Sequence, residues 1–230
     1  VLAKDPNNAY AHMALGMVNR NRTASHDMFY KTSRDTLLQQ SADALEKAVE
    51  LDEKNPEAYN ELGVTYRFQG RYAEARQMFE KALALDPNYA EALLNDGITA
   101  MEHGDTARAR QKYQRAIQLN SKNPMAHYRL AEALGQEGNY HGALESLNTG
   151  LALDKDNAAI MSKMAEMYDR QGNQAAAVAN YRKALQANPA HMSAYIGLSN
   201  VFDSRGDGEA AMTELRDDSV PSSVRPKSPH

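Results

Sequence analysis

The chain has 230 residues, a formal net charge of −4, no cysteine and 42% hydrophobic residues. The absence of cysteine excludes disulfides and thiolate metal sites, and the interspersed charges give no basic surface of the kind that binds nucleic acid. No apolar run approaches the ~18 residues that suggest a transmembrane helix, and the start shows no signal peptide. The cytoplasm and a periplasm both fit this composition.

The first residues predict the end of a helix, because Val1 to Lys4 are followed by Asp5-Pro6-Asn7 and proline cannot continue a helix. We interpret residues 1–8 as the end of a preceding repeat, and the chain as a fragment or processed form of a longer protein. A helical pattern then opens at Ala9. The next unit, residues 9–55, is interrupted by an insertion.

The insertion adds 13 residues, because 22 positions separate Asn19 from Ser41 where 9 separate Tyr66 from Ala75. It falls at about residues 20–40 and is expected to project from one side of a helical stack. From residue 34 to residue 51 the apolar spacing predicts one lengthened second helix.

Residues 56–89 show the repeating unit most clearly. Their first part has Tyr59, Leu62, Gly63 and Tyr66 at i, i+3, i+4 and i+7, which is one face of a helix. Gly70 is expected to end that helix in the left-handed conformation, because glycine has no Cβ. A second helix is predicted over the following apolar pattern, and Asp86-Pro87-Asn88 ends it.

The same pattern recurs along the chain. Glycine stands every 34 residues, at Gly70, Gly104, Gly138, Gly172 and Gly206. A strict period of this length predicts a stacked array of helix pairs. The predicted units are 56–89, 90–123, 124–157 and 158–191, then a shortened unit at 192–217 and an extended tail rich in proline and serine at 218–230.

The pattern resembles the tetratricopeptide repeat (TPR) family, in which an aromatic residue, Leu-Gly, tyrosine, alanine, a second aromatic, alanine and proline follow at fixed places. Here those places are Tyr59, Leu62, Gly63, Tyr66, Ala75, Phe79, Ala82 and Pro87. The resemblance implies an all-α fold, a right-handed α-solenoid of antiparallel helix pairs. The repeat ends of the Asp-Pro-Asn type lead us to interpret the chain as bacterial.

Apolar residues also stand outside the expected core stripe of the first helices, and such residues suggest a surface kept for contact. In TPR proteins the first helices line a concave surface that binds a peptide. Carried over, the resemblance implies a peptide-binding set made of Met13, Met17, Asn60, Val64, Arg67, Leu94, Asn95, Ile98, Met101, Tyr128, Arg129, Glu132, Lys163, Glu166 and Arg170, continued by Ile196 and Asn200. This set is apolar in its first half and charged in its second, unless some members only pack between neighbouring first helices.

One position departs from the pattern. Asp96 stands where the other units have Leu15, Leu62, Leu130, Met164 and Leu198. We interpret it as a carboxylate held by a local polar contact, because a buried polar group needs a partner, or as a residue at a tolerated surface edge. The alternative is that it tunes the binding surface beside Asn95. Asn95 and Arg129 also match two of five places of the carboxylate clamp of chaperone-binding TPR proteins, too few to predict that function.

The predicted function is a non-catalytic protein–protein interaction scaffold whose partner is a protein or peptide segment with apolar and charged parts. No cofactor, metal or nucleic acid is expected, because no catalytic constellation or metal-ligand spacing is present. An accessory array of a larger enzyme or of a membrane-tethered assembly factor is the alternative, and a nucleic-acid-binding helical repeat is disfavoured by the acidic charge. Self-association through the ends of the array or the tail is a further expectation.

Overall fold

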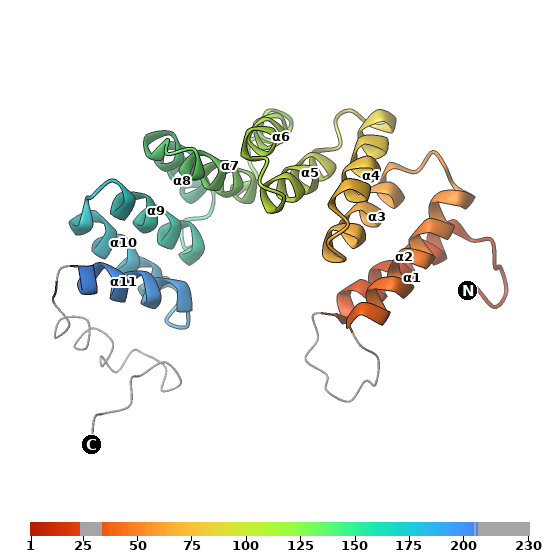
Figure 1. The fold of residues 1–230 in the computed structure, drawn as a ribbon, viewed down its shortest axis with the longest axis horizontal. Helices are drawn as coiled ribbons and strands as arrows, with labels where there is room; N and C mark the ends of the chain where they lie inside the picture. Colours follow the sequence, from red (N-terminus) through yellow and green to blue (C-terminus); the bar gives the residue numbers. More distant parts are fainter. Residues whose placement is uncertain (24–33, 205, 207–230) are drawn as a thin grey trace, which may run out of the picture. The chain divides into compact units, whose positions relative to one another are not determined.

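The computed structural model describes residues 1–23, 34–204 and 206. These residues form eleven α-helices and no strand (Figure 1). The helices are α1 (Ala9–Arg22), α2 (Arg34–Leu51), α3 (Pro56–Phe68), α4 (Tyr72–Leu85), α5 (Ala90–Glu102), α6 (Thr106–Leu119), α7 (Pro124–Gln136), α8 (Tyr140–Leu153), α9 (Ala158–Arg170), α10 (Gln174–Ala187) and α11 (Met192–Ser204). The predicted all-α helical-repeat architecture is confirmed.

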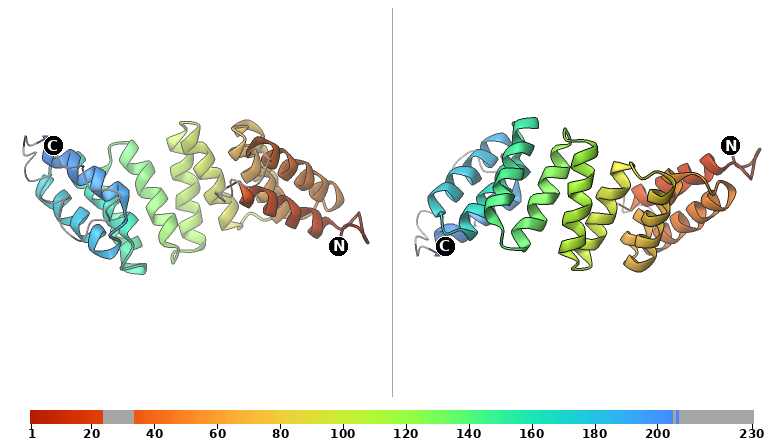
Figure 2. Two further views of the ribbon diagram at one scale, coloured as in Figure 1. Left: turned by 90° about the horizontal axis from the view of Figure 1, so that it is seen from below. Right: turned by 90° about the horizontal axis from the view of Figure 1, so that it is seen from above.

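The chain divides into two compact units, Val1–Ser121 with α1 to α6 and Lys122–His230 with α7 to α11. In each unit a helix packs most closely on its partner in a pair, as α1 does on α2 and α7 on α8 (Figure 2). The second helix of one pair then packs on the first helix of the next, α2 on α3 and α8 on α9. Every pair therefore depends on a neighbour to bury its apolar surface.

The helix starts are fixed by local side chains. Asn55 caps α3 by accepting the Ala58 N–H through its Oδ1 at 3.2 Å, and Pro56 follows at the first helical position. Asn123 and Pro124 repeat this arrangement at the start of α7. An asparagine side chain satisfies a free N–H of the first turn, and proline at the first position loses no hydrogen bond.

The recurring glycines end the first helices, as predicted. Gly70, Gly104, Gly138, Gly172 and Gly206 have φ values of +70° to +86°. After α7, the Gly138 N–H donates to the Gly135 carbonyl at 3.2 Å and the Asn139 N–H donates to the Leu134 carbonyl at 2.9 Å. This is the double hydrogen bond of a Schellman motif, which satisfies the last carbonyls of a helix.

Replacing Gly138 by alanine is expected to lower the free energy of unfolding by about 1 kcal/mol, because an L-residue pays this cost in the left-handed region. A Cβ at Gly138 would meet no atom within 4 Å, so the cost is one of backbone conformation alone. Urea unfolding followed by circular dichroism measures the change. The control is Glu137→Ala, one residue earlier in a right-handed conformation, which should change stability by less than ~0.5 kcal/mol.

Helices of a pair approach closely where glycine faces an aromatic ring. A Cβ built on Gly63 would lie 2.7 Å from the Phe79 ring, and one built on Gly97 would lie 2.5 Å from the Tyr113 ring. Both rings are fully buried. Gly63 and Gly97 are therefore positions where a side chain has no room, and the core of their helix pairs lies there.

The predicted start of α1 at Ala9 and the lengthened α2 over Arg34–Leu51 are confirmed. Ser41 of α2 is fully buried, and its hydroxyl lies 3.0 Å from that of Thr65 on α3. Residues 24–33 of the predicted insertion, the second half of the predicted shortened unit at 192–217 and the tail at 218–230 lie outside the described residues.

Candidate interaction surface

The predicted binding residues lie on the odd-numbered helices, on α1, α3 and α5 in the first unit and on α7, α9 and α11 in the second. Three of them are interior side chains. Met13 and Val64 are each 8% exposed and belong to one core cluster with Leu62 and Tyr66, and Asn60 is completely buried. Direct contact of these three with a ligand, as the sequence suggested, is not supported, because neighbouring helices already cover them.

A series of polar contacts joins α1, α3 and α5. Arg20 Nη2 lies 2.6 Å from Glu61 Oε2, and both side chains are largely buried. Asn60 donates to the other Glu61 oxygen at 3.2 Å and accepts from Asn95 Nδ2 at 3.0 Å. These polar side chains therefore form hydrogen bonds and an ion pair with one another across the three helices.

Sequence reasoning missed Arg20 and Glu61. Arg20 falls within the predicted insertion, and Glu61 is not in the predicted set although Asn95 and Arg129 occupy the same place in later repeats. The two residues lie 41 positions apart, so only the packing of α1 on α3 brings them together. Their opposite charges at neighbouring first helices were the available signal.

Arg67 links α3 to α5 through its ion pair with Glu102, at 2.7 Å. Its guanidinium carbon also lies 4.4 Å from the centre of the Phe68 ring. The Phe68 residue is 40% exposed and adds apolar surface beside this ion pair. Arg67, Glu102 and Arg34 of α2 line a surface cavity of about 660 Å³. The predicted site residue Arg67 therefore borders a surface cavity, although only 14% of its side chain is exposed.

Helix α5 presents the apolar part of the predicted surface. Leu94, Ile98 and Met101 are all partly exposed and follow at i, i+4 and i+7, so they share one face. Ala92, Asp96 and Ala100 of the same helix are buried and face its neighbours. The side chains that the sequence placed on a contact surface are therefore separated from those that hold α5 in the stack.

The second unit carries the charged part, which forms one cluster on α7 and α9. Glu132 lies 2.7 Å from Arg129 and 3.6 Å from Lys163. Glu166 in turn contacts Lys163 at 2.7 Å and Arg170 at 2.9 Å. The charges predicted to meet a ligand are thus paired with one another in the free chain.

Tyr128 lies beside this cluster, with the cations of Arg129 and Lys163 at 5.6 Å and 5.9 Å from its ring centre. Burial favours the neutral form of Lys163, but its hydrogen bond to Glu166 and the nearby Tyr128 and Glu132 raise its pKa above the ordinary value. Lys163 therefore stays a cation at neutral pH and holds the two carboxylates together.

Asp96 is 1% exposed, and both of its oxygens are paired. Arg108 of α6 donates to them at 2.8 Å and 2.9 Å, and Lys112 Nζ lies 2.9 Å from Oδ2. The interpretation of Asp96 as a carboxylate held by a local polar contact is confirmed. Its partners belong to the other helix of the same pair, so Asp96 ties α5 to α6.

Within the described part of the chain, no group of three or more His, Asp or Glu side chains is arranged to hold a metal ion. None of the described helices is both long enough and apolar enough to cross a membrane. What the described surface offers is an apolar helix face and a self-paired charged cluster, which are features for contact with another molecule.

Sequence profiles described as tetratricopeptide repeat match residues 56–89, 100–166 and 162–223. No curated protein sequence matches the chain. Among solved structures, PilF of Pseudomonas aeruginosa is similar at a TM-score of 0.71 and 21% identity, over 93% of this chain and 92% of that one.

The MamA protein is similar at a TM-score of 0.63 and 23% identity, over 79% of this chain and 92% of that one. YrrB, described as a TPR protein with an unusual peptide-binding site, is similar at a TM-score of 0.62 and 23% identity, over 84% and 93%. At these identities the structures establish the fold alone. The helix pairs, the glycine-ended first helices and the matching profiles together place this chain in the tetratricopeptide repeat family.

Proposed function

We propose that the chain is a non-catalytic protein–protein interaction scaffold, and that it binds a peptide or an extended segment of a partner on its odd-numbered helices. The observation that carries the proposal is the partly exposed face of α5 formed by Leu94, Ile98 and Met101. Apolar side chains on an otherwise polar surface favour contact with a partner.

The chemistry of this face suits a peptide with apolar side chains. Met101 and, on α1, Met17 are partly exposed and flexible, so they can adapt to partners of different shape. Asn95 lies on the same helix; its Nδ2 donates one hydrogen bond to Asn60, and the rest of its carboxamide can bind a peptide backbone. The support is therefore an apolar anchor surface with a polar group beside it, which is a common composition of peptide sites.

The charged cluster of the second unit supports a different role for that part of the surface. Arg129, Glu132, Lys163 and Glu166 are already paired, so a ligand gains little net free energy by replacing one of these contacts. We expect this cluster to set the specificity and the rate of association of a segment that binds the second unit, through charge complementarity.

Introducing two charges on the α5 face, with Ile98→Glu and Met101→Glu together, is expected to lower peptide affinity at least tenfold, because a carboxylate cannot be buried under an apolar side chain without cost. Peptides would first be selected from a phage-displayed random library on the unaltered full chain. Their affinities for the two chains would then be compared by isothermal titration calorimetry.

Gln111→Glu with Gln114→Glu is the matched control. It adds the same charge at the same spacing on the exposed face of α6. Circular dichroism would show that both variants keep their helices. Equal affinity of the selected peptides for the α5 variant and the unaltered chain would overturn the assignment of this face.

A further inference from the structure

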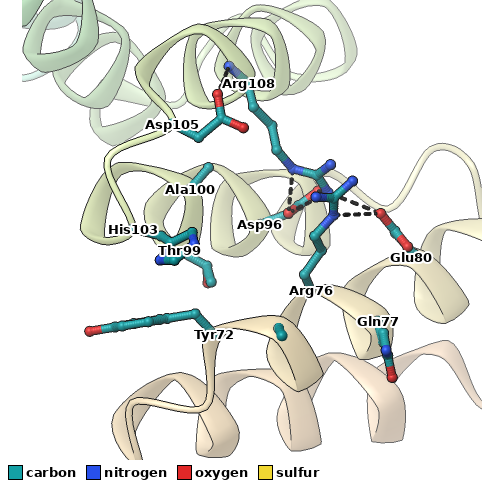
Figure 3. Close-up of a pocket in the computed structure, with 11 residues that line it drawn as sticks. Tyr72, Arg76, Gln77, Glu80, Asp96, Thr99, Ala100, His103, Asp105 and Arg108 are labelled. Carbon is teal, nitrogen blue, oxygen red and sulfur yellow. Dashed lines mark hydrogen bonds and ion pairs between the residues drawn. The ribbon is translucent and has the colours of Figure 1, made fainter.

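A cavity of about 370 Å³ lies on another part of the first unit, between α4 and the second half of α5 with the start of α6 (Figure 3). Tyr72 and Arg76 border it from α4, and Asp96, Ala100 and His103 border it from α5. Its volume falls within the ~300–1,000 Å³ of small-molecule sites. Ile98 and Met101 are not among its lining residues, so it is separate from the proposed peptide-binding face.

The cavity exists because a large side chain is missing. Ala100 stands where the other repeats, at steps of 34 residues, have Tyr66, Leu134, Tyr168 and Phe202. Tyr66 shares a core cluster with Ala42 of α2, and Phe202 shares one with Val178 of α10.

Arg76 of α4 occupies the position in its repeat that is equivalent to Ala42 and Val178 in theirs. Its side chain is 54% exposed and does not fill the space. The vacancy therefore lies where an aromatic ring packs in the neighbouring repeat.

In the preceding repeat the Tyr66 ring has a hydrogen-bond acceptor, Glu46, and an equivalent acceptor is present at the cavity. The Tyr66 hydroxyl donates to Glu46 Oε1 at 2.8 Å, and burial together with this bond raises the pKa of Tyr66 to about 12, so it remains a donor. The residue 34 positions after Glu46 is Glu80, which borders the cavity. A phenol seated in the cavity has a carboxylate acceptor at the equivalent place.

The charges around the cavity favour a neutral ligand. Arg76 pairs with Glu80 at 2.9 Å, and Asp96 pairs with Arg108 (Figure 3). Lys112, outside the lining residues, also pairs with Asp96. With Asp105, which caps α6 through the Arg108 N–H, three cations face three carboxylates. An anionic ligand would have to break the ion pair of Arg76, Arg108 or Lys112 to gain a counter-charge.

The Tyr72 and His103 rings border the same cavity with their centres 5.7 Å apart, which provides aromatic contact surface. We infer that this cavity binds the side chain of a tyrosine from a partner polypeptide, which takes the place that Tyr66 occupies in the preceding repeat. The ring fills the space over Ala100, and the phenol hydroxyl donates to Glu80.

The probe is p-cresol, the side chain of tyrosine, titrated into the isotopically labelled full chain and followed by two-dimensional NMR. A dissociation constant on the order of 1 mM is expected for so small a ligand. Saturable shifts are expected at the amides of Tyr72 to Glu80 and of Asp96 to Arg108. Toluene, which lacks the hydroxyl, should bind at least threefold more weakly.

Filling the cavity from within provides the second arm. Ala100→Tyr should abolish the p-cresol shifts and raise Tm by at least about 2 °C, because the new ring packs in the vacancy and donates to Glu80. Ala84→Tyr, on the exposed side of α4, should leave both p-cresol binding and Tm unchanged. This pair separates occupation of the cavity from the general effect of an added tyrosine.

Three results would each overturn the inference: no saturable shift at about ten times the expected dissociation constant, equal affinity for toluene and p-cresol, or unchanged p-cresol binding by Ala100→Tyr. The first two use the unaltered chain, so they decide the matter even if the filled variant does not fold. Neither depends on the peptide-binding face of α5.

Discussion

Replacing Phe79 by alanine is expected to lower the free energy of unfolding of the first unit by about 3–5 kcal/mol, the cost of emptying a large core position. The Phe79 side chain is completely buried and packs over Gly63, where α3 and α4 come closest. Alanine removes the whole ring and leaves a cavity between helices that glycine cannot fill. Urea unfolding measures the loss, and Leu85→Ala, at an exposed position of the same helix, is the control.

The packing of Phe79 on Gly63 also predicts that the effect of Gly63→Ala on stability changes sign when the Phe79 ring is removed. Gly63→Ala alone should destabilise the chain, because its Cβ would lie 2.7 Å from the ring. In the Phe79→Ala background the same change should stabilise it, because alanine favours the helix and the obstructing ring is gone. If Gly63→Ala has the same effect in both backgrounds, the two residues do not share the contact described here.

The second large effect is expected at the buried ion pair of α5 and α6. Arg108→Met should destabilise the first unit by about 3 kcal/mol, because it removes the main partner of a carboxylate that is only 1% exposed. Lys112 remains 2.9 Å from Asp96 and keeps the loss at the lower end of the expected range. Chemical unfolding measures it, with Arg115→Met on the exposed side of α6 as the control.

The double variant Asp96→Leu with Arg108→Met should recover most of this stability. Leucine is the residue that Leu62, Leu130 and Leu198 provide at the same place in other repeats, and replacing a buried ion pair by apolar side chains is often neutral or stabilising. A double variant less stable than Arg108→Met would contradict this explanation. So would an Arg108→Met chain within ~0.5 kcal/mol of the unaltered one.

The fold could be predicted from the sequence because its signals are local. A glycine that must take a positive φ, an asparagine before a proline, and one small residue facing one ring each fix a helix end or a helix contact within a few residues. These signals recur every 34 residues from Gly70 onward. In the repeat at residues 9–55, which the insertion takes out of that period, the apolar helical spacing over residues 34–51 predicted α2.

The candidate site was less predictable, because exposure depends on how closely the helices of successive pairs approach. Val64 and Ile98 occupy the same place in successive repeats, yet Val64 is buried in a core cluster and Ile98 is partly exposed. The partners of Asp96 were equally hidden, since Arg108 lies 12 residues further on another helix.

The vacancy at Ala100 was visible in the sequence as a small residue among large ones, but only the structure shows the cavity that results.

The binding role of the α5 face can be tested most directly by titrating the isotopically labelled full chain with a library-selected peptide and following each amide by NMR. Our account predicts that the largest shifts fall between Leu94 and Met101 and vanish when Ile98 and Met101 are both replaced by glutamate. Shifts confined to α4 and α6, or shifts that survive that replacement, would contradict it.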